Sequence, residues 1–418
     1  MLNILKNEEL RKKILFSLLV IVVFRILAHV PVPGVDLAAV RAYLGSNAIF
    51  GMFDLFSGGG FQNFSIVTLG LGPYINASII LQLFTKMIPA LEELSKEGET
   101  GREKINMYTK YLTVPLALVQ AYGVYFLLSR QTVMGALGTT ELTVLLFTLV
   151  GGSMIMIWLG DLVTEYGVGQ GISLLIFVGI VSRLPTDALS LVSFVDKYNI
   201  VYLFILLALS GLVIMGIVLV NEGMRNIPIE YGRRGVRTQK VSNFLPVKIN
   251  QAGVIPIIFA VSLVLVPSLI SGPLQAASVP GLQDLGFFLA RNFNSNSIMY
   301  NVLYFMLVFG FTFFYTFMQF DPVKIADDIK KRGGFIPGIR PGLATASYLK
   351  SITIRLTLVG AIFLGVIAIL PYITQSFTGI QQLAIGGTGI LIVVSVVLET
   401  IRQVESMMVT RNYQSFLQ

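Results

Sequence analysis

The chain has 418 residues, of which 55% are hydrophobic and only 12% are charged, and its mean hydropathy is +0.79. A soluble domain carries roughly 25% charged residues, so this composition excludes an ordinary soluble fold and indicates a surface that mostly faces lipid. The absence of cysteine excludes disulfides and thiol catalysis, and the meaning of the net charge of +8 depends on where the charges lie.

The predicted elements are membrane spans, because apolar stretches of about 20 residues, the length that crosses roughly 30 Å of hydrocarbon, recur along the chain. The first stretch follows a basic segment, residues 1–13, and is longer than the core of a signal peptide, so we expect a retained span. The fifth stretch is short and flanked by glycine. In chain order the ten predicted spans are 14–33, 66–88, 111–129, 141–160, 171–184, 200–220, 252–271, 298–320, 351–374 and 383–404.

The segment 48–65, between the first two spans, is apolar enough to enter the membrane but is interrupted by polar residues and glycines. It contains Asp54, the run Gly58–Gly60, Gln62 and Asn63. Broken backbone at membrane depth must be buried in protein or line a cavity. The pattern therefore predicts a re-entrant piece packed inside the protein, with an interfacial external loop as the alternative.

Lysine and arginine collect on one side of this predicted topology. Cytoplasmic loops retain basic residues because their translocation is costly. Ten spans place 22 of the 30 basic residues on the side of the two termini and five on the other side. The split predicts that both termini are cytoplasmic.

Two predicted cytoplasmic loops, 221–250 and 321–350, are long and carry six basic residues each. Two bulky basic platforms on one face suggest that something large and acidic docks there. Basic loops also serve simply to enforce topology. Both interpretations stay open at this point.

Enzymatic function is not expected, and neither is a cofactor. The only histidine is His29, so a histidine-based triad or a multi-histidine metal site is excluded. The glycine-rich stretch GVGQG at 167–171 does not fit the spacing of a nucleotide-binding turn and does not follow a predicted strand. These glycines indicate a tight turn before the fifth span.

An ion-coupled transporter is the main rival interpretation, since ten spans suit that class. Transporters usually bury acids, bases or histidines near the membrane centre as coupling sites. Here the middles of the spans are almost free of ionisable groups: Arg25 is the clearest exception, interpreted as a snorkelling or helix-paired arginine, and Glu399 lies near a cytoplasmic end. A channel for varied polymers would need this lack of fixed binding groups.

Several longer motifs carry a resemblance to a known family. They are LGLGPYINASIILQLF (69–84), KEGETGREKINMYTKY (96–111), WLGDLVTEYGVGQGISLLIF (158–177), LPVKINQAGVIPIIFA (245–260), GGFIPGIRPG (333–342) and RLTLVGA (355–361). In order and spacing the chain resembles the SecY family, the pore-forming subunits of the bacterial Sec protein translocase. The resemblance covers essentially the whole chain.

The resemblance implies an all-α polytopic membrane protein, with ten transmembrane helices in two inverted five-helix halves around a central pore and with a re-entrant plug helix. The halves would be residues 1–190 and 191–418. Five spans per half are compatible with inversion, because the second half then starts from the opposite face. The implied function is to conduct unfolded secretory polypeptides across the membrane and to release transmembrane segments sideways into it.

The resemblance also implies a ring of apolar side chains at the pore constriction. Two pairs in it are four residues apart and so share a helix face, and branched aliphatic side chains can exclude ions yet yield to a moving chain. The default interpretation of such isoleucines is ordinary packing, and the choice of Ile258 over Ile255 rests on alignment alone. The implied ring is Leu71, Ile75, Ile172, Ile176, Ile258 and Ile392.

Two further sites are implied by the resemblance. The segment at about 50–65 would be the plug, with Phe53, Asp54, Phe56, Ser57, Gly58, Gly59, Gly60 and Phe64. A lateral gate would open between the second and third spans on one side and the seventh and eighth on the other. Its polar candidates, which could equally cross-link helices by hydrogen bonds, are Asn76, Ser78, Asn250, Gln251 and Ser262.

Docking and partners are implied in the same way. Prolines and glycines around Arg340 preclude a continuous helix and present that side chain outward. The implied docking residues for a motor ATPase or the ribosome are Arg233, Arg234, Arg237, Arg340 and Tyr413. The implied partners are the SecE and SecG subunits, the SecA motor ATPase, the ribosome with its RNA and proteins, signal peptides, nascent chains and membrane lipids. The implied location is the bacterial plasma (inner) membrane, crossed several times.

Overall fold

The computed structural model describes residues 8–32, 35, 40, 57–61, 63–130, 138–185, 200–231, 243–275, 277, 279–294, 297–378 and 386–415. Each of the ten predicted spans coincides with a helix, or with a pair of helices in the case of the seventh. These helices are α1 (Glu8–Leu27), α4 (Gly72–Met87), α6 (Glu99–Arg130), α7 (Thr139–Tyr166), α8 (Gly171–Val181), α10 (Ile200–Glu222), α11 (Ile255–Val264) with α12 (Val266–Gln275), α14 (Ile298–Gln319), α16 (Leu343–Thr378) and α17 (Gly386–Ser415).

Proline explains one sharp bend and one interruption in these helices. α4 is followed by α5 (Pro89–Lys96) at an angle of 100°. Ile88, which precedes the proline, is extended with φ −105° and ψ 113°, because a residue before proline is disfavoured in the helical region. α11 ends at Val264 shortly before Pro267, which lacks the N–H needed to continue the helix.

Length and composition mark several described helices as membrane spans. Four stretches qualify: Thr139–Tyr166, Ile255–Gly272, Ile298–Lys331 and Leu343–Ser376, and the bent pair α4–α5 would be a fifth. α8 is apolar but has only 11 residues, about 16 Å of helix, which is shorter than the hydrocarbon layer. The structure is therefore that of a multi-pass membrane protein in which some spans are short or bent.

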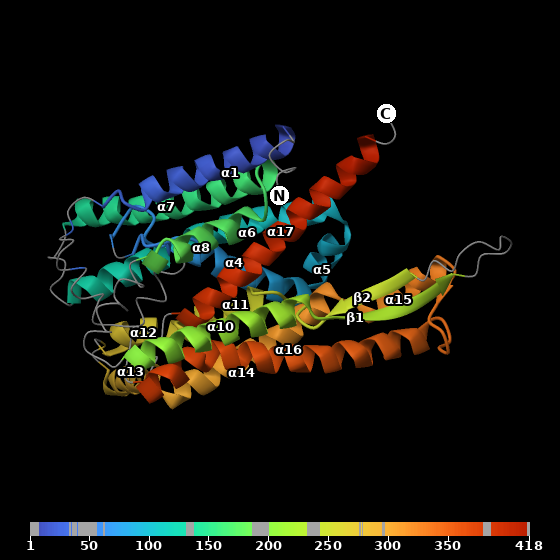
Figure 1. The fold of residues 1–418 in the computed structure, drawn as a ribbon. Helices are drawn as coiled ribbons and strands as arrows, with labels where there is room; N and C mark the ends of the chain where they lie inside the picture. The colour runs from blue at the N-terminus through green and yellow to red at the C-terminus, as the bar shows by residue number, and fades with distance from the viewer. Residues whose placement is uncertain are drawn as a thin grey trace.

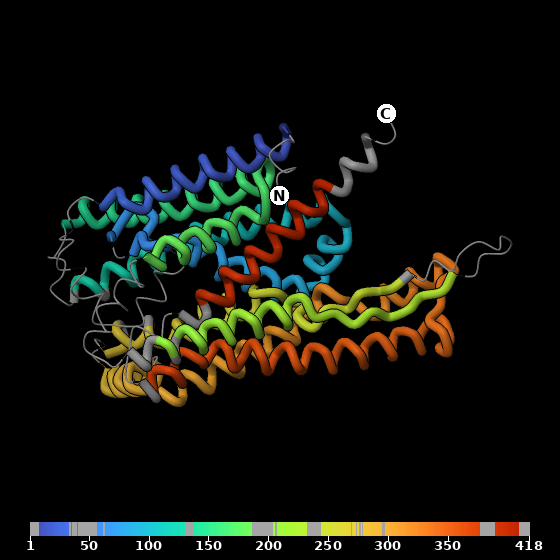
Figure 2. Tube along the Cα trace, viewed as in Figure 1, coloured from blue at the N-terminus to red at the C-terminus, as the bar shows by residue number. Residues whose placement is uncertain are grey.

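The helices form two groups that follow the order of the chain (Figure 1). One group holds α1, α4, α6, α7 and α8, coloured blue to green, and the other holds α10, α11, α14 and α16, coloured lime to orange-red. Figure 2 shows α17, in red, crossing between them. Contacts between the early and late parts of the chain run through α4 with α11, α8 with α17, and α6 with α12.

A small sheet joins the two loops predicted at 221–250 and 321–350. It consists of β1 (Met224–Tyr231), β2 (Asn243–Lys248) and β3 (Gly334–Phe335) in the order β2-β1-β3, with antiparallel pairing throughout. In β1, Ile227 and Ile229 are buried and their neighbours are exposed, which is the two-residue period of a half-buried strand. The sequence analysis did not predict these strands.

The sheet and the N-terminal turns of α16 share a hydrophobic core with α15 (Pro322–Lys331). Ile227 and Val247 of the strands pack with Ala326 of α15, Ile336 and Leu349. Asp321 caps α15 by accepting hydrogen bonds from the backbone of its first turn. The two predicted platforms are thus one packed unit, which we call the platform. α13 (Pro280–Asn292) lies at the opposite end of the molecule (Figure 1).

Candidate functional site

The six predicted ring residues come from helices through which the two groups meet. All belong to, or pack against, one buried hydrophobic cluster. Ile172 is half-buried, and the exposed fractions of the other five lie between 0% and 8%. Leu71 and Ile75 lie at the start of α4, Ile172 and Ile176 on α8, Ile258 on α11 and Ile392 on α17. Ile255 packs against the same cluster, so burial does not decide between Ile255 and Ile258, and the ring stays a prediction.

The described part of the predicted plug segment is buried. Ser57, Phe61 and Phe64 have exposed fractions of 0%, 3% and 0%, and the Ser57 hydroxyl accepts a hydrogen bond from the Phe61 backbone at 2.9 Å. Such burial favours a re-entrant piece over an interfacial loop. Phe53, Asp54 and Phe56 lie outside the described residues.

The C-terminal end of this segment is tied to the chain that follows α1. The Val32 N–H donates to the Phe64 carbonyl at 2.9 Å, and the Ile66 N–H donates to the Val30 carbonyl at 3.0 Å. At the other end, Gly58 has φ +65°, and a Cβ there would lie 2.3 Å from the ring of Phe24. The segment therefore packs directly on α1, and only glycine fits at that contact.

The helices predicted to flank a lateral gate contact one another through α4 and α11, and polar groups bridge α4 to α14. The Tyr315 hydroxyl of α14 donates to the Gln82 side-chain oxygen of α4, and the Gln82 amide donates to the Ser78 hydroxyl at 2.8 Å. Tyr315 also packs edge-on against Phe259 of α11, with ring centroids 5.2 Å apart. These contacts join the second span to the seventh and eighth.

The other gate candidates occupy different surroundings. Asn76 is half-buried on α4, and the Ser262 hydroxyl donates to the Ile258 carbonyl one turn back in its own helix. The Asn250 amide donates to the Asn221 side-chain oxygen at 2.8 Å and so joins the connection between β2 and α11 to α10. Buried side-chain oxygens of Asn250 and Gln251 have no hydrogen-bond partner within the described part of the chain. The gate role of these residues stays a prediction.

A polar junction connects the platform to the helices. Arg402 of α17 forms an ion pair with Glu222 at 2.6 Å, and the Asn221 amide donates to the Ser395 hydroxyl of α17 at 2.8 Å. Burial lowers the pKa of Lys248, at the end of β2, and the charge of Arg402 lowers it further, whereas Glu222 opposes the shift. α10, the base of the hairpin and α17 are therefore linked at the platform end of the helical bundle.

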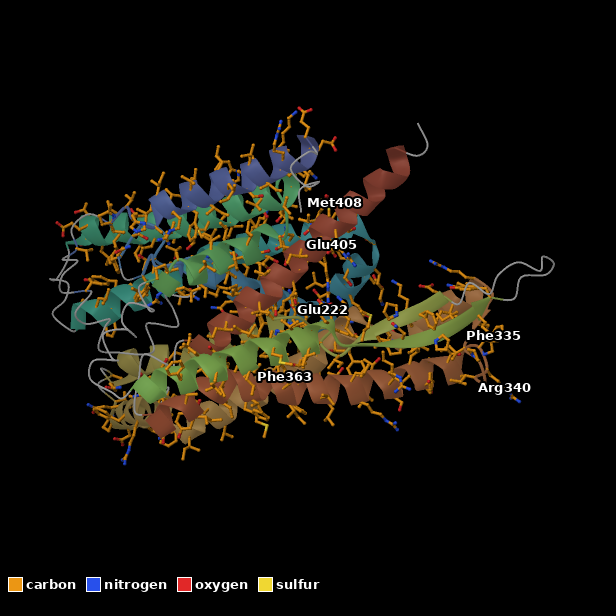
Figure 3. The ribbon with its side chains drawn as sticks, viewed as in Figure 1. Glu222, Phe335, Arg340, Phe363, Glu405 and Met408 are labelled. Carbon is orange, nitrogen blue, oxygen red and sulfur yellow. The ribbon has the colours of Figure 1, made fainter. Side chains whose placement is uncertain are left out.

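Arg340 lies at the outermost tip of the platform and points away from the helices (Figure 3). It is exposed, between glycines 338 and 342 with φ +80° and +102°. The Thr345 hydroxyl donates to the Arg340 carbonyl at 2.9 Å and so fixes the backbone of the tip. Arg233, Arg234 and Arg237 lie outside the described residues, and Tyr413 lies on α17 with its side chain outside them.

Comparison with known protein families shows which family the chain belongs to. The family model described as SecY matches residues 65–401, which is most of the chain. The chain belongs to the SecY family. The resemblance inferred from the motifs is thereby confirmed, and so is the predicted α-helical membrane fold.

Individual proteins of the SecY family match this chain over nearly its full length. The protein translocase subunit SecY of Corynebacterium glutamicum is 42% identical over 438 residues, covering 99% of this chain and 98% of that protein. A solved SecY structure, described as having a plug domain that stabilises the closed state of the translocation channel, matches with a TM-score of 0.68 at 21% identity, covering 96% of this chain and 93% of that one. Sec61 in a canine ribosome-channel complex matches with a TM-score of 0.60 at 20% identity, covering 96% and 93%.

Sequence reasoning missed several polar contacts that SecY-family motifs alone do not reveal. Gln82 stands four residues after Ser78, a spacing that places both on one helix face, but the partner Tyr315 lies 233 residues away. In the sequence Arg402 is simply one of the basic residues on the predicted cytoplasmic side, and its pairing with Glu222 depends on how α10 and α17 pack. Neither pair leaves a local signal in the sequence.

Proposed function

We propose that this chain forms the polypeptide-conducting channel of a Sec-type protein translocase, passing unfolded secretory polypeptides across the membrane. The observation that carries this proposal is that the six candidate ring residues lie on different helices and meet in one place. They converge in one buried apolar cluster from four helices, and those helices pair as α4 with α11 and α8 with α17, which joins the early and late parts of the chain. A seam between two halves, closed by yielding aliphatic side chains, is where a chain could pass.

The halves 1–190 and 191–418 would move apart at this seam. α4 contacts α11 and bridges to α14 through Gln82 and Tyr315, so parting these helices would open a sideways exit for transmembrane segments. The buried segment from Ser57 to Phe64 would close the pore on the external side. The plug domain described for a SecY protein of the same fold supports this role.

The energy for transport would come from a partner, docked on the basic platform. Arg340 offers an exposed guanidinium at the tip, and its fork can pair with two acceptors on an acidic protein or on RNA phosphates. SecA and the ribosome are the proposed docking partners, and the ribosome complex described for Sec61 supports the latter. SecE and SecG are proposed as companion subunits in the lipid-exposed belt.

The proposed location is the bacterial plasma membrane with both termini in the cytoplasm. The start of α1 and the end of α17 point toward the end of the molecule that carries the sheet (Figure 1). The predicted topology puts 22 of the 30 lysines and arginines on the side of the termini, and cytoplasmic loops retain basic residues.

The test is reconstitution of the purified complex into proteoliposomes with the motor ATPase and ATP. A secretory polypeptide should become protected from external protease in an ATP-dependent way, and liposomes without this chain should give no protection. Uptake of a small solute down an ion gradient, with no polypeptide protected, would contradict the proposal and favour the transporter.

A further inference from the structure

Arg25 is a charged residue in the last turns of the apolar helix α1. Ionisable groups in membrane helices are costly, and they persist where a specific partner satisfies them. Arg25 is half-buried, and it follows Phe24, whose exposed fraction is 1%. Its side chain is therefore held at the packed face of α1 instead of extending into lipid or water.

The guanidinium joins two elements that are distant in the sequence. Arg25 Nη1 donates to the Gly58 carbonyl at 2.9 Å and to the Ser182 hydroxyl at 2.8 Å. Gly58 belongs to the buried segment proposed as the plug, and Ser182 directly follows α8, which carries two of the candidate ring residues. One side chain thus bridges the first span, the plug segment and the end of a pore helix.

The two ends of the described plug segment are held differently. Residues 64–66 are tied by backbone hydrogen bonds to residues 30–32, and such pairing does not depend on any side chain. The turn at Gly58 meets α1 through the packing of Phe24 and through the Arg25 bond to its carbonyl. A carbonyl at a positive-φ turn cannot be satisfied by continuing helix, so a charged donor there adds a strong and directional bond.

We propose that Arg25 is the latch that holds the plug segment in its sealing position, a positioning residue for channel closure. This inference rests on the proposed function of the chain. Opening breaks the Arg25–Gly58 bond, while the 30–32 and 64–66 pairing keeps the segment tethered as it moves. The Ser182 contact aims the guanidinium and contributes less to holding the plug.

The cysteine-free sequence permits a direct test of this latch. Ser57→Cys places a single thiol in the plug segment at a position with 0% exposure, and Ser153→Cys places one on α7 at 1% exposure, outside it. In the reconstituted complex, without motor or substrate, a membrane-impermeant thiol reagent is added from the external side. Because losing a charge-assisted hydrogen bond shifts such an equilibrium by on the order of tenfold, Arg25→Gln should raise the labelling rate of Ser57→Cys about tenfold.

The controls separate a latch from general loosening. Ser153→Cys should label at the same rate with and without Arg25→Gln. Arg355→Gln, which removes an exposed arginine from another span, should leave Ser57→Cys protected, and Ser182→Ala should have a smaller effect than Arg25→Gln. Arg25→Lys should restore part of the protection, since an ammonium can reach one acceptor but lacks the guanidinium fork.

Two results would overturn the latch. One is unchanged labelling of Ser57→Cys in the Arg25→Gln variant, and the other is an equal rise at both thiols. ATP-dependent protection of a secretory polypeptide is measured in the same vesicles. If wild-type vesicles protect none, the proposed function fails whatever the labelling shows, whereas normal protection with unchanged labelling removes the latch alone.

Discussion

At the scale of single residues, the proposed seal consists of apolar side chains that carry no fixed charge. Ile75 and Ile392 have exposed fractions of 5% and 3% and come from α4 and α17, one helix on each side of the seam. Ions do not cross a narrow apolar constriction because water is excluded from it. A polar amide at either position would hold water in the closed pore.

Ile75→Asn and Ile392→Asn should therefore raise the ion conductance of the resting channel. The increase should be about tenfold or more if the amide admits a continuous row of water molecules through the constriction. Single-channel recording in planar bilayers is the measurement. Ile79→Asn is the matched control, because Ile79 lies one turn further along α4 with an exposed fraction of 3%. Equal conductance in all three variants would assign Ile75 and Ile392 to ordinary packing.

At the scale of elements, the proposed lateral gate lies where α4 meets α11 and α14. The Tyr315 hydroxyl is the group that crosses from α14 to α4, while its ring packs on Phe259 independently of the hydroxyl. Interhelical hydrogen bonds in membranes contribute about 0.6 kcal/mol on average and up to about 1.7 kcal/mol. The hydrogen bond between Tyr315 and Gln82 is therefore strong enough to favour a closed gate and weak enough to break when the gate opens.

Tyr315→Phe should remove this hydrogen bond without disturbing the packing of the aromatic ring on Phe259. We expect export of substrates with shortened signal-sequence cores to rise a few-fold, since less binding energy is then needed to part the helices. Tyr304→Phe is the control on the same helix, because the Tyr304 hydroxyl is buried and has no hydrogen-bond partner in the described part of the chain. A similar gain from both substitutions would show that the Gln82 bond does not restrain the gate.

Elements differ in how far the sequence predicts them. The ten spans could be located because long apolar stretches and basic loops are local signals. The strands β1 and β2 were missed because each is short and contains a proline, which argues against a strand, and because Ile227 and Val247 are buried only through packing on α15 and α16. The ring could be named only through the family motifs, and the partners of Arg25 and Gln82 depend on tertiary packing that no local pattern encodes.

At the scale of the whole molecule, the platform projects from one end and is linked to α17, which carries a candidate ring residue. The ion pair of Glu222 with Arg402 and the bond of Asn221 to Ser395 connect its base to α17, which also carries Ile392. A partner that pulls on the platform would transmit force to α17 through this ion pair and this hydrogen bond. Arg340, at the far tip, is the exposed cation best placed to receive that partner (Figure 3).

Arg340→Glu should leave insertion and abundance unchanged, because one arginine among the many basic residues of the predicted cytoplasmic side contributes little to topology. Motor-driven or ribosome-coupled export should fall sharply, and Arg340→Lys should recover part of it, since a lysine offers a point charge in place of a fork. Lys350→Glu, an exposed charge reversal on α16, should cost much less. Equal impairment by the two glutamate variants would make Arg340 one more topology charge.

The central claim is that a polypeptide passes through the apolar seam between the two halves, and site-specific photo-crosslinking tests it most directly. A photoreactive amino acid is placed at Ile75 in the ring or at Val359, which is 55% exposed on the outer face of α16. With a secretory polypeptide arrested in transit through the reconstituted complex, the account predicts strong crosslinks from position 75 and only background from position 359. Crosslinks from position 359 that equal or exceed those from position 75 would contradict it.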